Sequence, residues 1–108
     1  MSDKGKHNIY VIELYEEVLN DKKFLEKNPN YTPGKPCVYV GMTARSPEER
    51  FNQHLSGYKS ARIVKKFGAR LRPRQYESHN PMTYEDAMNM EVEKARRLRA
   101  KGWGVWQN

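Results

Sequence analysis

Residues 37–54 read CVYVGMTARSPEERFNQH, a stretch that predicts a strand followed by a helix. The apolar run CVYVG is typical of a short buried strand, which we expect to stop at Gly41. Ser46 is a favourable N-cap, Pro47 suits the first helical position, and Glu49 stands three residues after Ser46, as a capping box requires. The stretch therefore predicts a strand, a glycine turn and a capped helix.

The helix predicted after this turn covers residues 47–55 and ends near Gly57. Arg50 and His54 are four residues apart within it, so both side chains project from one face of the helix. We expect the glycine turn and the capped helix to present these two side chains beside Tyr39 of the preceding strand.

A second strand pattern comes earlier in the chain. Residues 8–14, NIYVIEL, are rich in β-branched and aromatic side chains and predict a strand. Residues 15–36 contain Asn-Pro, Pro-Gly and Lys-Pro pairs, which are typical of turns, together with one or two helical turns. We expect a long irregular connection here, and either a substrate-contacting insertion or a surface excursion would fit it.

Two short elements follow the capped helix. Residues 61–67, ARIVKKF, predict a short helix that Ser60 caps and Gly68 closes. Residues 70–77, RLRPRQYE, look extended, and Pro73 is typical of an edge strand because proline has no N–H to donate.

The longest helical pattern covers residues 84–101, where Thr83 and Asp86 resemble a second capping box. Its apolar positions recur with helical spacing and form one stripe along the helix: Ala87, Met90, Ala95 and Leu98. Glu91 lies at the margin of this stripe. Residues 103–108, WGVWQN, are a candidate for a last short strand.

The length of 108 residues fits one domain. Cys37 is the single cysteine, which excludes an internal disulfide and a four-cysteine zinc site, suits a reducing cytoplasm and is typical of an inert core thiol. The N-terminal residues MSDKGKHN are polar and precede no long apolar stretch, so we expect neither a signal peptide nor a membrane span. A cytoplasmic protein with no membrane partner is the expectation.

The net charge of +7 is unevenly placed. Eight basic residues and no acidic residue lie between Arg50 and Tyr76. A stretch of one sign on a folded domain favours a polyanionic partner, because each neutralised phosphate releases counterions. The alternative is a solvated basic face that serves only solubility.

The order of these features resembles the GIY-YIG nuclease superfamily. Asn8-Ile9-Tyr10 resembles its first motif, Tyr39-Val40-Gly41 its second, and the helix with Arg50 its motif helix, in which some members also carry a histidine, here His54. Ala87 and Glu91 match the alanine and glutamate of the late helix, and Asn108 resembles an asparagine that follows it in some members. The resemblance implies an α/β fold of the α+β type over residues 1–108, with a small antiparallel three-stranded sheet flanked by helices and an inserted connection at about 15–35.

The resemblance also implies a chemistry, the hydrolysis of phosphodiester bonds with one divalent ion, Mg²⁺ or Mn²⁺. Glu91 would hold the metal, Arg50 would bind the scissile phosphate through its planar fork, and His54 would relay a proton or bond a phosphate oxygen. Tyr10 or Tyr39 would act on the attacking water. A tyrosine base works near neutral pH only if nearby cations favour the phenolate.

The basic stretch would then contact the nucleic acid, DNA rather than RNA. The residues expected to bind backbone phosphates, with Tyr58 interleaved, are Lys59, Arg62, Lys65, Lys66 and Arg70. No base-reading motif is present, so we expect a structure-selective or weakly specific endonuclease, or specificity supplied by a protein partner.

Two alternatives stay open. The first is a basic DNA- or RNA-binding module of the same fold that has lost catalysis, which is favoured by Asn8 in place of the motif glycine. The second is a small structural or regulatory protein, which predicts no salt-dependent affinity for nucleic acid.

Overall fold

The computed structural model describes residues 5–107 of the chain. Within this range, four strands form one mixed sheet in the order β3-β1-β2-β4. β1 (Asn8–Leu14) pairs antiparallel with β2 (Cys37–Thr43) and with β3 (Gly68–Leu71), whereas β4 (Gly104–Gln107) lies parallel to β2. The α+β class is confirmed, but the expected three-stranded antiparallel sheet is wrong, because the residues after the last helix add a fourth, parallel strand.

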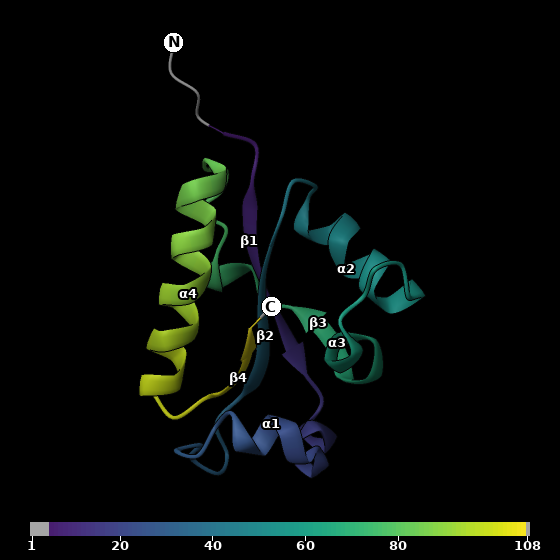
Figure 1. The fold of residues 1–108 in the computed structure, drawn as a ribbon, viewed down its shortest axis with the longest axis vertical. Coiled ribbons are helices and arrows are strands. Elements are labelled where there is room, and N and C mark those ends of the chain that lie inside the picture. Colours follow the sequence, from purple (N-terminus) through teal and green to yellow (C-terminus); the bar gives the residue numbers. More distant parts are fainter. Residues whose placement is uncertain (1–4, 108) are drawn as a thin grey trace.

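Helices cover both faces of this sheet (Figure 1). α4 (Tyr84–Ala100) lies along one face, while α2 (Pro47–Ser56) and α3 (Arg62–Phe67) lie on the opposite side. η1 (Glu16–Asn20) and α1 (Lys22–Glu26) close the lower end of the molecule in this view, and η2 (Pro73–Gln75) follows β3. In the described part of the chain, no helix combines the length and apolar character needed to cross a bilayer.

The capped helix α2 forms as its sequence predicts. The Ser46 hydroxyl accepts a hydrogen bond from the Glu49 amide at 3.1 Å, and the Glu49 carboxylate accepts one from the Ser46 amide at 3.3 Å. Gly57 ends the helix with a φ of 94°, a left-handed conformation that glycine adopts without steric cost. This cap and this C-terminus fix the direction in which α2 leaves β2.

Other local expectations are corrected. β2 continues through Gly41 to Thr43, so Gly41 does not end the strand. Ser60 does not cap α3, whose N-cap position is Ala61, whereas Gly68 is its C-cap residue, as expected, and also begins β3. The extended segment predicted over residues 70–77 is strand only to Leu71, because Pro73 starts a 3₁₀ turn.

The connection expected to be irregular belongs to the core. It contains η1 and α1, and the side chains of Val18 and Phe24 are fully buried. A β-carbon at Gly104 would lie 2.8 Å from the Phe24 ring, so the ring packs directly against the backbone where β4 begins. The surface-excursion interpretation is therefore wrong for this part of the connection.

Asn28, at the end of the same connection, completes the outer edge of β4. Its side-chain amide donates to the Val105 carbonyl at 3.0 Å and to the Phe24 carbonyl at 2.8 Å, and its side-chain oxygen accepts from the Val105 amide at 2.8 Å. One asparagine side chain thus takes the place of a neighbouring strand at Val105. Asn80 does the same at Ile9 of β1, with two bonds of 2.9 Å.

We expect Asn28→Ala to lower the free energy of unfolding by about 2 kcal/mol, because it leaves the buried N–H of Val105 without a partner and leaves the Val105 carbonyl with Arg99 as its donor. Urea denaturation measures this change. Asn30→Ala is the matched control, since Asn30 is exposed two residues away. Equal effects of the two substitutions would contradict this account of the β4 edge.

Candidate active site

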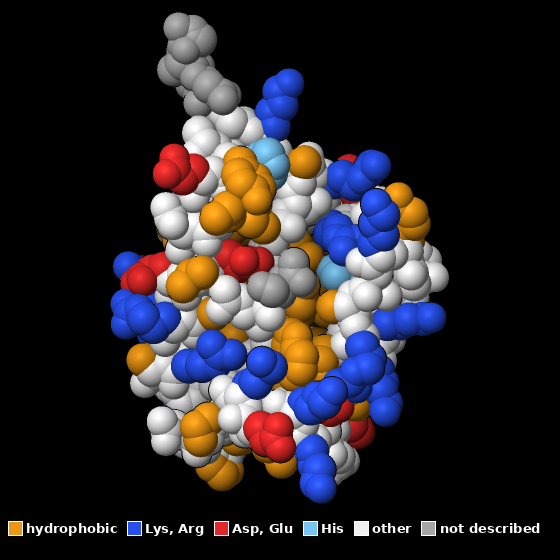
Figure 2. Space-filling view, in the orientation of Figure 1, with side chains coloured by type: hydrophobic (Ala, Val, Ile, Leu, Met, Phe, Trp, Pro, Cys, Tyr) orange, Lys and Arg blue, Asp and Glu red, His pale blue; other side chains and the backbone are white. Residues whose placement is uncertain are grey.

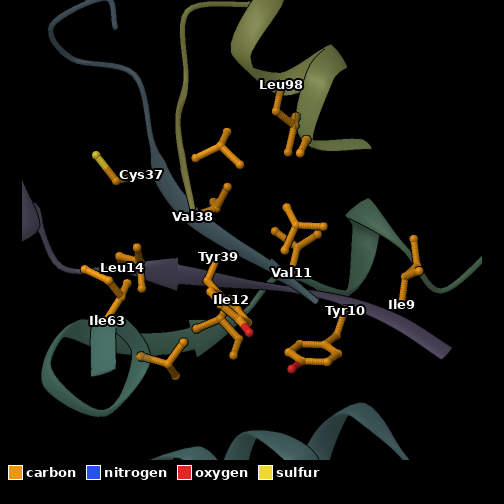
Figure 3. Packing of buried hydrophobic residues seen from close by; sticks show 14 of the residues in the cluster. Ile9, Tyr10, Val11, Ile12, Leu14, Cys37, Val38, Tyr39, Ile63 and Leu98 are labelled. Atoms are coloured by element: carbon orange, nitrogen blue, oxygen red, sulfur yellow. The ribbon is translucent and has the colours of Figure 1, made fainter. Parts of the chain in front are cut away.

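Two tyrosines from neighbouring strands and one histidine from α2 form a buried cluster. Tyr10 and Tyr39 point to the side of the sheet that faces α2, whereas Val11 and Leu98 lie on the α4 side (Figure 3). The Tyr10 hydroxyl lies 2.8 Å from Nε2 of His54, and the Tyr39 and His54 rings meet edge to face at 5.4 Å. All three side chains are 1% exposed or less, so this cluster is an interior feature of the domain.

Gly41 makes room for this cluster. It pairs with Tyr10 across the two strands, and a β-carbon at Gly41 would lie 2.6 Å from the Tyr10 hydroxyl oxygen and 3.0 Å from the Tyr39 ring. Such contacts are too short for any side chain, so the Tyr10 ring lies over a bare backbone position. This close approach, and not a turn, explains the glycine at position 41.

His54 is held as a neutral imidazole with a defined tautomer. The backbone amide of Ala61 donates to Nδ1 of His54 at 3.1 Å, so Nδ1 carries the lone pair. Burial, with a smaller contribution from the Arg50 charge, lowers the pKa of His54 to about 4. The proton of the neutral ring is therefore on Nε2, from which it is donated to the Tyr10 hydroxyl oxygen.

Both tyrosines are protonated near neutral pH. Burial raises the pKa of Tyr10 to about 12, against the opposing effects of the Arg50 charge and the Tyr39 hydroxyl. Burial also raises the pKa of Tyr39, and the neighbouring Tyr10 and Glu91 act in the same direction. A phenolate at this site therefore needs additional positive charge.

Glu91 is a buried carboxylate with an unused oxygen. It projects from α4, is 7% exposed, and among the described residues no group bonds its Oε2 atom. Desolvation raises the pKa of Glu91 to about 7, and its charge in turn raises the pKa of both Tyr10 and Tyr39. The charge of Glu91 therefore acts on both tyrosines of the cluster. Glu93, two residues further along α4, instead pairs with Arg96 and Arg97 on the exposed face.

Arg50 lies between the cluster and the loop that follows α2. Its guanidinium donates to the Tyr58 carbonyl at 3.2 Å, to the Lys59 carbonyl at 2.7 Å and to the side chain of Gln53 at 3.1 Å. These bonds engage three of its five N–H groups, so it has donors beyond those that hold the loop. The partnership with Gln53 was not predicted, although the three-residue spacing on a helix is a signal for it.

The predicted phosphate-binding residues do not form one cluster. Lys59 and Lys65 lie at the end of α2, since Lys59 covers the Tyr58 ring and Lys65 lies beside Gly57. Arg62 pairs with Asp21 at 3.0 Å, Lys66 lies over Phe67, and Arg70 pairs with Glu13 at 2.7 Å. On the face drawn in Figure 2, Lys and Arg side chains gather over the α2 and α3 side.

Two further expected positions have different outcomes. Asn8 donates from its side chain to the Arg45 carbonyl at 2.9 Å, so it ties the start of β1 to the loop before α2. Asn108 lies outside the described residues.

Within residues 5–107, no group of three or more His, Cys, Asp or Glu side chains is arranged to hold a metal ion.

Glu91 alone would therefore be the protein ligand of a divalent ion. Its unpartnered, buried Oε2 suits a hard cation, and one carboxylate suits Mg²⁺, which keeps several waters and is completed by substrate phosphates. The donor set fits a metal that binds together with its substrate.

Comparison with known proteins adds no relative, since no protein-family model, curated protein or solved structure matches this chain.

We expect Gly41→Ala to destabilise the protein by about 1–3 kcal/mol, because the new methyl group overlaps the Tyr10 ring. The penalty should shrink by about 1 kcal/mol or more in a Tyr10→Leu background, which lacks the outer ring atoms. A double-mutant cycle of unfolding free energies measures this coupling. Additive effects would mean that Gly41 does not make room for Tyr10.

We expect Glu91 to destabilise the native state as the pH rises. The unfolded carboxyl ionises near 4.5 and the folded one near 7, so the penalty is absent below about 4.5, grows through this window and reaches about 3 kcal/mol above it. Glu91→Gln should therefore flatten the rise in unfolding free energy on going from about pH 8 to about pH 5. Urea denaturation at the two pH values measures this.

Glu93→Gln is the control for this experiment. The pKa of Glu93 is lowered to about 2 by its bonds to Arg96 and Arg97, so Glu93 titrates below the tested window. Its substitution should leave the pH dependence between these two values unchanged. A wild-type profile that matches that of Glu91→Gln would contradict the raised pKa of Glu91.

Proposed function

We propose that this protein is a GIY-YIG-type endonuclease that hydrolyses phosphodiester bonds in DNA with one divalent ion, Mg²⁺ or Mn²⁺. The observation that carries the proposal is Glu91, a buried carboxylate with an unpartnered oxygen, whose charge also raises the pKa of Tyr10 and Tyr39. Burying such a group destabilises a domain unless a ligand uses it. Arg50 and His54 beside the same tyrosines supply the other groups that phosphodiester hydrolysis needs.

In the proposed reaction, the phenolate form of Tyr10, whose own proton has been lost to solvent, takes a proton from the attacking water. The water oxygen bonds to phosphorus as the bond from phosphorus to the leaving oxygen breaks, and the leaving oxygen takes a proton from solvent. His54 donates from Nε2 to the Tyr10 oxygen, so it orients the phenol and stabilises the phenolate. The charge of Arg50 already acts to lower the pKa of Tyr10, against the larger effect of burial. The remaining N–H groups of Arg50 bind the scissile phosphate and neutralise charge that develops on its oxygens.

Glu91 would hold the metal, which supplies positive charge for the phosphate oxygens and lowers the pKa of nearby acidic groups. Glu91 makes metal binding depend on pH. Because burial raises the pKa of Glu91 to about 7, the carboxylate is available to a cation only as the pH rises through that value. Metal affinity and cleavage should both increase from acidic to slightly alkaline pH.

A second candidate function is a nucleic-acid-binding module that lacks catalysis. The observation that favours it is the burial of Tyr10 and Tyr39, which are each 1% exposed and hold their protons near neutral pH. Arg50 also uses two donors on the loop that follows α2 and a third on Gln53 of its own helix. In such a module the basic face would bind phosphates and Glu91 would bind no metal.

The deciding experiment is nicking of supercoiled plasmid and cleavage of branched DNA with Mg²⁺ or Mn²⁺. We expect metal-dependent cleavage that falls about 100-fold or more in Glu91→Gln, while DNA affinity is retained, because the substitution removes the metal ligand and leaves the basic face intact. Gel-based cleavage and fluorescence anisotropy give the two readouts.

Glu93→Gln again provides the matched control, two residues away on the same helix, and should cleave like the wild type. Salt-sensitive DNA binding without cleavage by any variant would reject the endonuclease and support the binding module. The absence of salt-sensitive binding would reject both functions.

A further inference from the structure

The loop that follows α2 is bonded directly to two candidate catalytic side chains. Arg50 binds the carbonyl oxygens of Tyr58 and Lys59, and Nδ1 of His54 accepts from the amide of Ala61. The loop therefore shares its hydrogen bonds with the groups that would hold the phosphate and orient Tyr10. These hydrogen bonds fix the position of the loop relative to the side chains of Arg50 and His54.

This loop has an unusual backbone at its centre. Lys59 has a φ of 46°, in the left-handed region that a lysine side chain rarely adopts. The flanking bonds hold it there, because the Tyr58 amide donates to the Gln53 carbonyl at 2.9 Å and the Lys59 carbonyl accepts from Arg50 at 2.7 Å. Strained conformations of this kind persist where the surrounding structure imposes them, and they cluster at binding sites.

The loop presents an aromatic ring and a cation to solvent. Tyr58 is 54% exposed, and the Lys59 ammonium lies 5.6 Å from the centre of its ring. Lys65 lies beside Gly57 at the start of the same loop. An exposed aromatic ring with cations around it is the arrangement that proteins use to bind single-stranded nucleic acid, because a base stacks on the ring while the cations contact the backbone.

The backbone that carries this ring lies next to the proposed cleavage point. Arg50, which would hold the scissile phosphate, lies 3.2 Å from the Tyr58 carbonyl oxygen. Successive nucleotides of one DNA strand rise by about 3.4 Å, so a nucleotide adjacent to a phosphate at Arg50 reaches the loop. In a duplex that base is paired and stacked, and its faces are not available to a protein ring.

We infer that the loop Gly57–Ala61 is a stacking platform for an unpaired base next to the scissile phosphate, with Tyr58 as the ring that binds it. This inference rests on the proposed nuclease function and names its substrate class, DNA with an unpaired nucleotide at the cleavage point. It also gives the domain a source of selectivity by strand geometry, without base-specific contacts.

The test measures DNA affinity in the presence of a chelator, so that no cleavage occurs. The probes are a fluorescently labelled single strand of about 20 nucleotides and the blunt duplex of the same sequence, in salt of about 50 mM. The proteins are the wild type, Tyr58→Ala, Tyr58→Phe and Tyr15→Ala. Tyr15 is the matched control because it is 53% exposed and lies outside the loop.

We expect Tyr58→Ala to weaken binding of the single strand about tenfold or more and binding of the duplex less than about twofold. Tyr58→Phe should retain single-strand affinity, since the ring alone is needed, and Tyr15→Ala should bind both probes like the wild type. A circular dichroism spectrum of each variant establishes that it is folded.

Equal losses on both probes, or no loss on either, would overturn the stacking platform. That result leaves the proposed nuclease standing if metal-dependent cleavage is observed. Conversely, a selective loss on the single strand with no cleavage by the wild type supports the platform and rejects the nuclease. If the wild type binds neither probe, both proposals are rejected.

Discussion

The close approach of the Tyr10 ring to the Gly41 backbone is the constraint on which the candidate site depends. Because β1 and β2 are antiparallel and in this register, Tyr10 lies opposite a position without a side chain, and Tyr39 lies two residues away on the same face. In this arrangement the Tyr10 hydroxyl forms a hydrogen bond of 2.8 Å with His54 of α2. The capping box of α2 and the left-handed Gly57 then set where His54 and Arg50 stand relative to that hydroxyl.

The site is stable for reasons that have little to do with its polar groups. Apolar burial is the dominant favourable contribution to folding, and here it comes from Ile9, Val11 and Leu98 on the α4 side and from Ile63 and Val64 of α3 on the other. Against this background, a buried carboxylate and two buried phenols are unfavourable when charged. Natural domains tolerate such groups where function requires them, which is why polar burial at one end of an apolar sheet identifies a candidate site.

Local sequence patterns predicted the parts of this site that depend on neighbours in the chain. The α2 caps, the start of α4 and the position of Glu91 beside the apolar stripe of that helix follow from helical spacing and N-cap chemistry. The parallel β4 and the contacts of the loop after α2 depend on residues far apart in sequence, so no local pattern reports them. The purpose of Gly41 was misread for the same reason, since what excludes a side chain there is a ring from another strand. The connection between β1 and β2 was expected to be irregular because its proline pairs are typical of turns. No local pattern indicated that Val18 and Phe24 within it are buried.

The asparagine bonds at β4 and β1 also bear on how this protein meets copies of itself. A strand at the margin of a sheet offers unpaired N–H and C=O groups that another polypeptide can extend, the first step of strand addition and of fibril growth. Asn28 occupies those groups at Val105, and Asn80 occupies them at Ile9. Side-chain amides thus protect the sheet against intermolecular β-pairing at these two points, so copies of this domain can come close together without joining edge to edge.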